Sequence, residues 1–86
     1  VQYANGNGPI NTEDKAAIRS LQVNGRVVGS VVMPQRGAGN WTGGDAFGWS
    51  TALPVELRAG RQEIALVLRP SNENMNGRIN DAIVRG

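Results

Sequence analysis

The pair Asn24-Gly25 lies between two apolar segments, in the stretch "SLQVNGRVVGSVVMP". A two-residue hairpin turn of type I′ needs a positive φ at both central positions, and Asn followed by Gly adopts it most readily. The pair therefore predicts that residues 18–23 and 26–33 are neighbouring antiparallel strands. Pro34, which cannot donate a backbone hydrogen bond, is expected to end the second strand.

Glycine and asparagine divide the remaining chain into short β-branched runs. The 86 residues include twelve Gly and nine Asn, and no stretch of ten residues shows a convincing helical period. Further strands are predicted at 1–4, 53–58, 64–68 and 79–85, and residues 10–17 are left open between a loop and one helical turn. About six short strands with turn signals between them predict an all-β fold, an antiparallel β-sandwich.

The composition favours one small domain, residues 1–86, without a catalytic centre. A chain of this length buries only about 60–65% of the surface that its unfolded form exposes, so its core is thin. It has no Cys, hence no disulfide or thiolate metal site, and no His, the commonest general base. Glu56 and Glu63 lie on either side of a predicted turn, where we expect solvated side chains rather than the facing carboxylates of a glycosidase. We therefore expect no enzyme activity.

The basic residues are dispersed along the chain. Eight Arg and one Lys give a formal net charge of +2, but they occur singly. Nucleic-acid binding would need them clustered on one face and interleaved with aromatic residues, so no nucleic-acid partner is expected. No apolar run approaches the roughly 20 residues of a membrane span, so no membrane partner is expected either.

Aromatic residues are concentrated in one glycine-rich segment. Three of the four in the chain fall within "NWTGGDAFGW", residues 40–49, in a predicted loop at 35–50. Binding residues often gather on a loop above a rigid scaffold, and Trp offers a broad apolar face with one polar N–H. Trp41, between polar neighbours, is the candidate for stacking on a ligand. Trp49 runs directly into a predicted strand, which favours packing, and Phe47 is expected to anchor the loop.

Five motifs in order resemble a known family. They are "YANGNGP", "VNGRVVGSVVMP", "RGAGNW…GW", "LPVELRAGRQEIALVL" and "GRINDAIV". Together they are similar to the carbohydrate-binding modules of families 6 and 35, in which a "YANG" strand end precedes a "VNG..VG.V.FP" hairpin. The likeness covers nearly the whole chain. Here "TGGDAFG" separates the two loop Trp residues, which are close together in the family, and several strands that precede "YANG" in the family are absent.

The resemblance implies a fold, a function and a set of residues. The fold would be a jelly-roll-type β-sandwich, and the function would be to bind a polysaccharide or oligosaccharide without catalysis, as part of a secreted, extracellular enzyme that degrades it. The implied carbohydrate-binding residues are Trp41, Asn40, Asp45, Trp49 and Asn80. Asp81 matches the family's aspartate for a structural calcium ion, although the acidic partners that complete that site are missing here. No other cofactor is expected.

A second hypothesis belongs to a different class. A sandwich without its first strands would expose sheet edges and apolar faces that need a cover. A second copy would supply it, giving a homodimer completed by pairing or swapping strands. In that case the protein would be an assembly module, and its loop Trp residues would serve an interface instead of a sugar. The two hypotheses are compatible.

Overall fold

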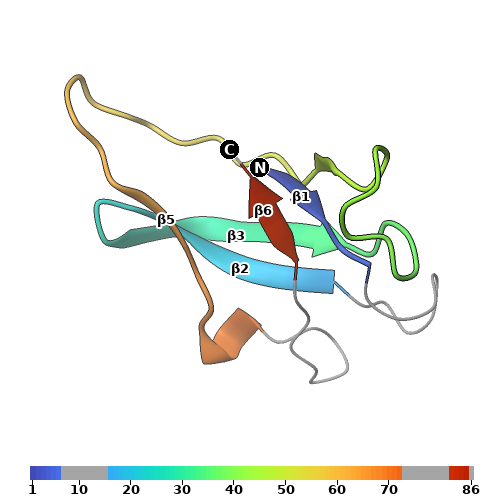
Figure 1. The fold of residues 1–86 in the computed structure, drawn as a ribbon. Coiled ribbons are helices and arrows are strands. Elements are labelled where there is room, and N and C mark those ends of the chain that lie inside the picture. The colour runs from blue at the N-terminus through green and yellow to red at the C-terminus, as the bar shows by residue number, and fades with distance from the viewer. Residues whose placement is uncertain (7–15, 73–81, 86) are drawn as a thin grey trace.

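The computed structural model describes residues 1–6, 16–72 and 82–85. This part of the chain is all-β, with two antiparallel three-stranded sheets, a single 3-10 turn and no α-helix (Figure 1). The elements in chain order are β1 (Gln2–Ala4), β2 (Ala16–Val23), β3 (Arg26–Pro34), β4 (Gly48–Trp49), β5 (Ile64–Val67), η1 (Pro70–Asn72) and β6 (Ile83–Arg85).

The predicted hairpin is confirmed and forms the longest pair of strands. β2 and β3 are antiparallel from Ala16 opposite Pro34 to Val23 opposite Arg26. The turn residues Asn24 and Gly25 have φ of 52° and 80°, the left-handed values that a type I′ turn requires. β5 pairs with the other edge of β2, so the strand order of this sheet is β3-β2-β5.

The second sheet has the order β4-β1-β6 and is built from short strands. β1 confirms the strand predicted at 1–4. β6 lies within the strand predicted at 79–85, whose first residues, 79–81, are outside the described residues. β4 lies inside the stretch 35–50 that was predicted to be entirely loop. A two-residue strand has no periodicity of its own, and only its pairing with β1 reveals it.

Both sheets contribute to one hydrophobic core. Its buried members come from β1, β2 and β3: Tyr3, Ala17, Leu21, Val31 and Met33. Leu53, Leu66 and Ala82 pack against them. Two hydrogen bonds join the sheets within this core, from the Tyr3 hydroxyl to the Pro34 carbonyl (2.9 Å) and from Asn5 Nδ2 to the Met33 carbonyl (2.9 Å). Figure 1 shows β6 crossing in front of β3 at a steep angle.

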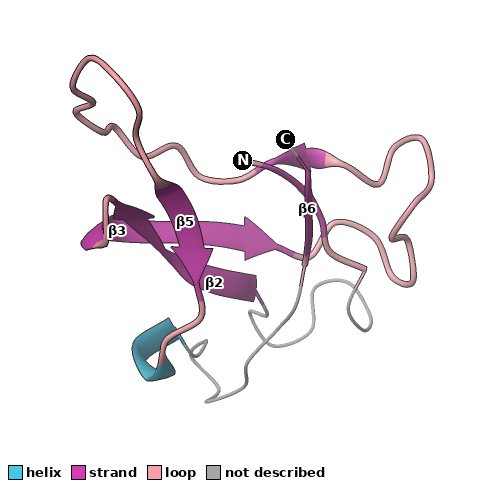
Figure 2. Ribbon diagram, turned by 60° about the vertical axis from the view of Figure 1, so that its left-hand side comes forward, coloured by secondary structure: helices cyan, strands magenta, loops and turns pink. Residues whose placement is uncertain are grey.

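The prediction of a strand at 53–58 is wrong. Residues 52–62, called the arm below, form no strand and make no backbone-to-backbone hydrogen bond with any described residue. The arm is held at its ends. Before it, Thr51 exchanges hydrogen bonds with the outer edge of β3 at Val32; after it, Asn24 binds Glu63. Between these points it projects away from the sheet (Figures 1 and 2).

The arm does alternate apolar and polar residues, but a strand also needs a neighbouring strand to bond with. Leu53 accounts for one apolar position, since it covers Gly29 so closely that a Cβ there would lie 2.8 Å from the Leu53 methyl carbons. Pro54 then removes a backbone donor. The next apolar residues, Val55 and Leu57, remain 36% and 51% exposed.

Candidate functional site

Three strands place Trp49, Gln2 and Arg85 in one row. Gln2 in β1 is the direct partner of Trp49 in β4 and of Arg85 in β6. Residues directly opposite in an antiparallel sheet point to the same face, and the next residue along each strand points to the other. Tyr3 follows Gln2 and is buried in the core at 3% exposure, so the row faces away from the core. We call these three residues, together with Phe47, the outer row.

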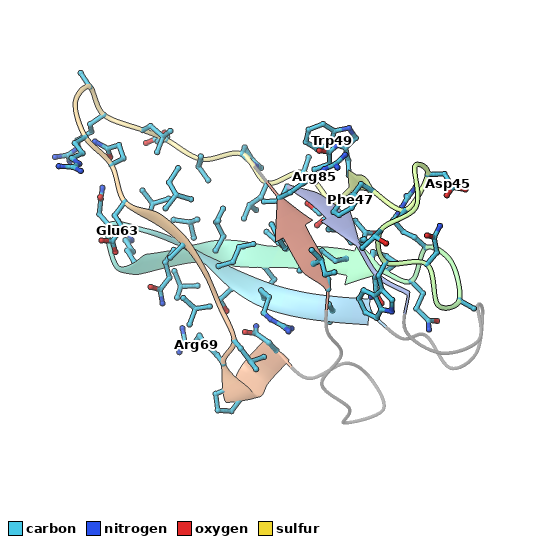
Figure 3. The ribbon with its side chains drawn as sticks, viewed as in Figure 1. Asp45, Phe47, Trp49, Glu63, Arg69 and Arg85 are labelled. Carbon is cyan, nitrogen blue, oxygen red and sulfur yellow. The ribbon has the colours of Figure 1, made fainter. Side chains whose placement is uncertain are left out.

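Contacts between side chains order the outer row. Arg85 Nε donates a hydrogen bond to Gln2 Oε1 at 2.9 Å, and Arg85 Cζ lies 3.9 Å from the centre of the Phe47 ring. A guanidinium group above an aromatic face at this distance is a favourable cation–π contact. Figure 3 shows Phe47, Arg85 and Trp49 gathered at one place on the molecule. No described residue accepts a hydrogen bond from the terminal nitrogens of Arg85, which leaves them available to a ligand.

Trp49 is the most exposed large apolar side chain among the described residues, at 75%. The expectation that it packs beneath the loop is therefore wrong. Alternation along β4 explains the exposure of Trp49. Gly48 pairs with the buried Tyr3, so the adjacent Trp49 points to the opposite face, outward. Trp41 is less exposed than Trp49, and its role in stacking on a ligand stays a prediction. Phe47, expected to anchor the loop, is partly buried and supports Arg85.

Backbone contacts with the end of β1 hold the glycine-rich loop, residues 35–47. The Arg36 amide donates to the Asn5 carbonyl and the Gly39 amide to the Gly6 carbonyl, both at 2.8 Å. Gly6 must be glycine, because a Cβ there would lie 2.8 Å from the backbone nitrogen of Asn40. The Arg36 guanidinium closes the loop by donating from Nε to the Ala46 carbonyl (3.0 Å).

Asn40 and Asp45, predicted to bond sugar hydroxyls, bond each other. Asn40 Nδ2 donates to Asp45 Oδ1 at 2.9 Å, and Asn40 Oδ1 accepts from the Gly43 amide at 3.2 Å. The two side chains thus stabilise the loop turn. Asp45 is exposed, and only one of its oxygens is engaged by a described residue. Figure 3 shows Asp45 on the loop, away from the direction in which Trp49 projects.

Two of the predicted site residues, Asn80 and Asp81, lie outside the described residues. Within the described ranges, no three His, Cys, Asp or Glu side chains gather closely enough to hold a metal ion. Asn72, the last residue of η1, is buried; its Nδ2 donates to Ser20 Oγ (3.0 Å), and its Oδ1 accepts from the Arg69 amide (2.7 Å). Asn72 therefore has a structural role.

Sequence reasoning missed Gln2 and Arg85. Alternation with Tyr3 could have marked Gln2 as outward-facing, but nothing in the sequence brings residues 2, 49 and 85 together. Only the pairing of three distant strands does so. Tyr3 itself stays protonated at neutral pH, because burial raises its pKa above the ordinary value of 10.0 while nearby Arg36 lowers it in part. It is a core residue and offers no catalytic base.

Comparisons with known proteins give no relative: no family model, no curated protein and no solved structure matches this chain. In the described part of the chain, no helix has the length and apolar character needed to cross a membrane.

Proposed function

We propose that this protein is a non-catalytic carbohydrate-binding module whose binding face is the outer row. The observation that carries this proposal is Trp49, a 75% exposed indole placed in register with an outward-facing amide and a guanidinium. The two sheets would form part of a jelly-roll-type β-sandwich. In a secreted polysaccharide-degrading enzyme, such a module would keep the enzyme near its substrate by raising the local concentration.

The chemistry of the outer row suits a sugar. A pyranose ring has flat patches of C–H groups surrounded by hydroxyls. The Trp49 indole can cover such a patch, and its N–H remains useful at a half-wet site. Gln2 and Arg85 then offer hydrogen-bond donors beside the ring, and the Arg85 fork is oriented in advance by Phe47 and Gln2. A side chain that is already ordered loses less entropy when the ligand binds.

The position of the outer row on strands also favours binding, because neighbouring strands hold its residues at a regular spacing. The three residues lie on neighbouring strands: Trp49 on β4, Gln2 on β1 and Arg85 on β6. Neighbouring strands are about 4.8 Å apart, so the three residues span roughly 10 Å. An extended polysaccharide could cross all three strands. Trp41, Asn40 and Asp45 on the loop stay predicted contacts for a longer chain, as does Asn80.

Fluorescence of single-tryptophan variants tests the proposal. The chain has only two Trp residues, so Trp41→Phe leaves Trp49 as the reporter and Trp49→Phe leaves Trp41. We expect soluble xylan, mannan, pectin or galactan to shift the emission of Trp41→Phe. Trp49→Ala should weaken binding by affinity electrophoresis about tenfold or more, equivalent to about 1.4 kcal/mol. Because Trp49 is so exposed, its removal should leave folding unchanged.

Trp41→Ala is the matched control for the role of each ring. If Trp41→Ala abolishes binding while Trp49→Ala does not, the binding face is the loop and not the outer row. If no polysaccharide in the panel shifts either reporter or retards the wild-type protein, the carbohydrate hypothesis fails.

A further inference from the structure

The arm has the sequence pattern of a strand but no partner strand in the described part of the chain. From residue 52 to 62 no backbone-to-backbone hydrogen bond is made with any described residue. The arm nevertheless alternates apolar and charged side chains in Val55-Glu56-Leu57-Arg58-Ala59, a pattern typical of a half-buried strand. A groove with a volume of about 760 Å³ separates it from the end of the hairpin; the groove is lined there by Val23, Asn24, Arg26 and Val28. The described part of the chain therefore leaves the arm open to pairing.

We propose that the arm pairs with the arm of a second copy of this chain, antiparallel and centred on Leu57, to form a homodimer. In that register Leu57 lies opposite its own counterpart, and Val55 lies opposite Ala59 of the second copy. Glu56 then faces Arg58 across the two-fold axis, and Arg58 faces Glu56. The same patch on both subunits is thus self-complementary, as an isologous interface requires.

Charge and alternation select this register over its neighbours. Centring the pair on Glu56 or on Arg58 would place two like charges directly opposite each other, which destabilises a sheet. Centring it between two residues would put an apolar side chain opposite a charged one, because the side-chain period of a strand is two. Only the Leu57 register matches apolar with apolar and acid with base. Pro54, which has no N–H, falls outside the five paired residues.

The arm is poised for this pairing. Its ends are fixed by Thr51 at β3 and by Asn24 at Glu63, so little further ordering is needed on association. Val55 and Leu57 are 36% and 51% exposed and would gain burial. The outer row lies on the other sheet. The proposal of pairing therefore does not depend on the carbohydrate-binding proposal, and the two can be tested separately.

Charge reversal at two positions gives a sharp test. Glu56→Arg would place the new guanidinium of each copy opposite Arg58 of the other, and in Arg58→Glu two acids would meet in the same way. We expect each variant to dimerise at least about tenfold more weakly than the wild-type protein, measured by light scattering over a concentration series. An equimolar mixture of the two variants should form a heterodimer, because in a pair of two different variants no like charges lie opposite each other.

In that heterodimer one contact keeps the wild-type pair, Arg58 opposite Glu56, and the other is reversed, with the introduced base at position 56 opposite the introduced acid at position 58. The chain with Glu56→Arg carries two bases at positions 56 and 58, and the chain with Arg58→Glu carries two acids there. Antiparallel pairing about Leu57 sets each base opposite an acid, so both contacts are favourable. The mixture therefore restores association only if these two positions face each other.

Matched controls lie just outside the paired residues. Glu63→Arg and Arg61→Glu make the same changes of charge and should dimerise like the wild-type protein. Circular dichroism verifies that all four variants fold. A wild-type protein that stays monomeric throughout the series would overturn the inference. So would a mixture of Glu56→Arg and Arg58→Glu that associates no better than either variant alone.

Cysteine substitution tests the register directly, since the chain contains no Cys. Opposite residues in an antiparallel pair have Cα atoms about 4.5–5.5 Å apart, within reach of a disulfide. Leu57→Cys should therefore form a covalent dimer under mild oxidation. Val55→Cys should not, because the two Val55 positions would lie about 13 Å apart along the strands. Equal cross-linking of both variants would refute the Leu57 register.

Discussion

Gln2 and Tyr3 are consecutive residues whose side chains point to opposite faces of the sheet. Strand alternation turns Gln2 outward to Trp49 and Arg85, while Tyr3 enters the core and donates a hydrogen bond from its hydroxyl to the Pro34 carbonyl. Burial raises the pKa of Tyr3, and Arg36 offsets part of that rise. The buried phenol must stay neutral, which links the stability of the fold to pH.

Tyr3→Phe tests this linkage. Since the folded-state pKa is raised, the contribution of Tyr3 is complete below pH 10 and is lost as pH rises through the folded pKa. We expect Tyr3→Phe to lower the free energy of unfolding by about 1 kcal/mol at neutral pH, through the lost hydrogen bond. Above pH 10 the wild-type protein should lose stability faster than the variant. Tyr3 is the sole Tyr, so tyrosinate absorbance follows its titration directly. Parallel stability curves above pH 10 would contradict the linkage.

The hairpin and the arm show the same alternation and differ in their neighbours. β2 and β3 pair through a local turn, so their hydrogen bonds need only residues close in sequence. The arm has no described strand beside it and remains unpaired. Asn24 connects the two elements, because its side chain accepts a hydrogen bond from the Glu63 amide (2.9 Å) and donates one to Gln62 Oε1 (2.9 Å).

Asn24→Ala should therefore destabilise the protein through two effects. It removes the polar side chain whose local hydrogen bonding lets Asn adopt a left-handed conformation, and it removes the two side-chain contacts with Gln62 and Glu63. We expect a loss of about 2 kcal/mol in urea unfolding. Asn24→Asp keeps the acceptor oxygen and the tolerance of positive φ, and it should cost less than half as much. Equal losses in the two variants would show that the side-chain acceptor and the turn conformation contribute nothing.

The whole molecule depends on a single thin core. It measures 42 × 30 × 16 Å, and both sheets bury side chains in the same cluster. Met33, at 1% exposure, is one of the two largest fully buried side chains among the described residues. A chain of this size has little stability to spare, and a core shared by both sheets should make them unfold together.

Met33→Ala tests the dependence on that core. Removing a buried Met side chain typically costs about 2–5 kcal/mol. We expect a loss in that range, with far-UV circular dichroism and tryptophan fluorescence reporting one coincident transition. Val27→Ala, at a position 39% exposed, is the control and should change stability by no more than about 0.5 kcal/mol. Separate transitions for the two signals would mean that the sheets do not share one cooperative core.

Local interactions made the hairpin predictable from residues alone: Asn24 and Gly25 have the required φ whatever surrounds them, and the flanking strands bond each other. Alternation also predicted β5, and short β-branched runs predicted β1 and the strand at 79–85 that contains β6. It could not predict that 53–58 would lack a partner, that Trp49 would project while Trp41 is partly covered, or that Asn40 and Asp45 would bond each other. Pairing between residues 2, 49 and 85 depends on contacts far apart in sequence, whose hydrogen bonds and burial exist only once the chain has folded. For that reason most strands could be predicted along the chain, but the outer row and the unpaired arm could be found only in three dimensions.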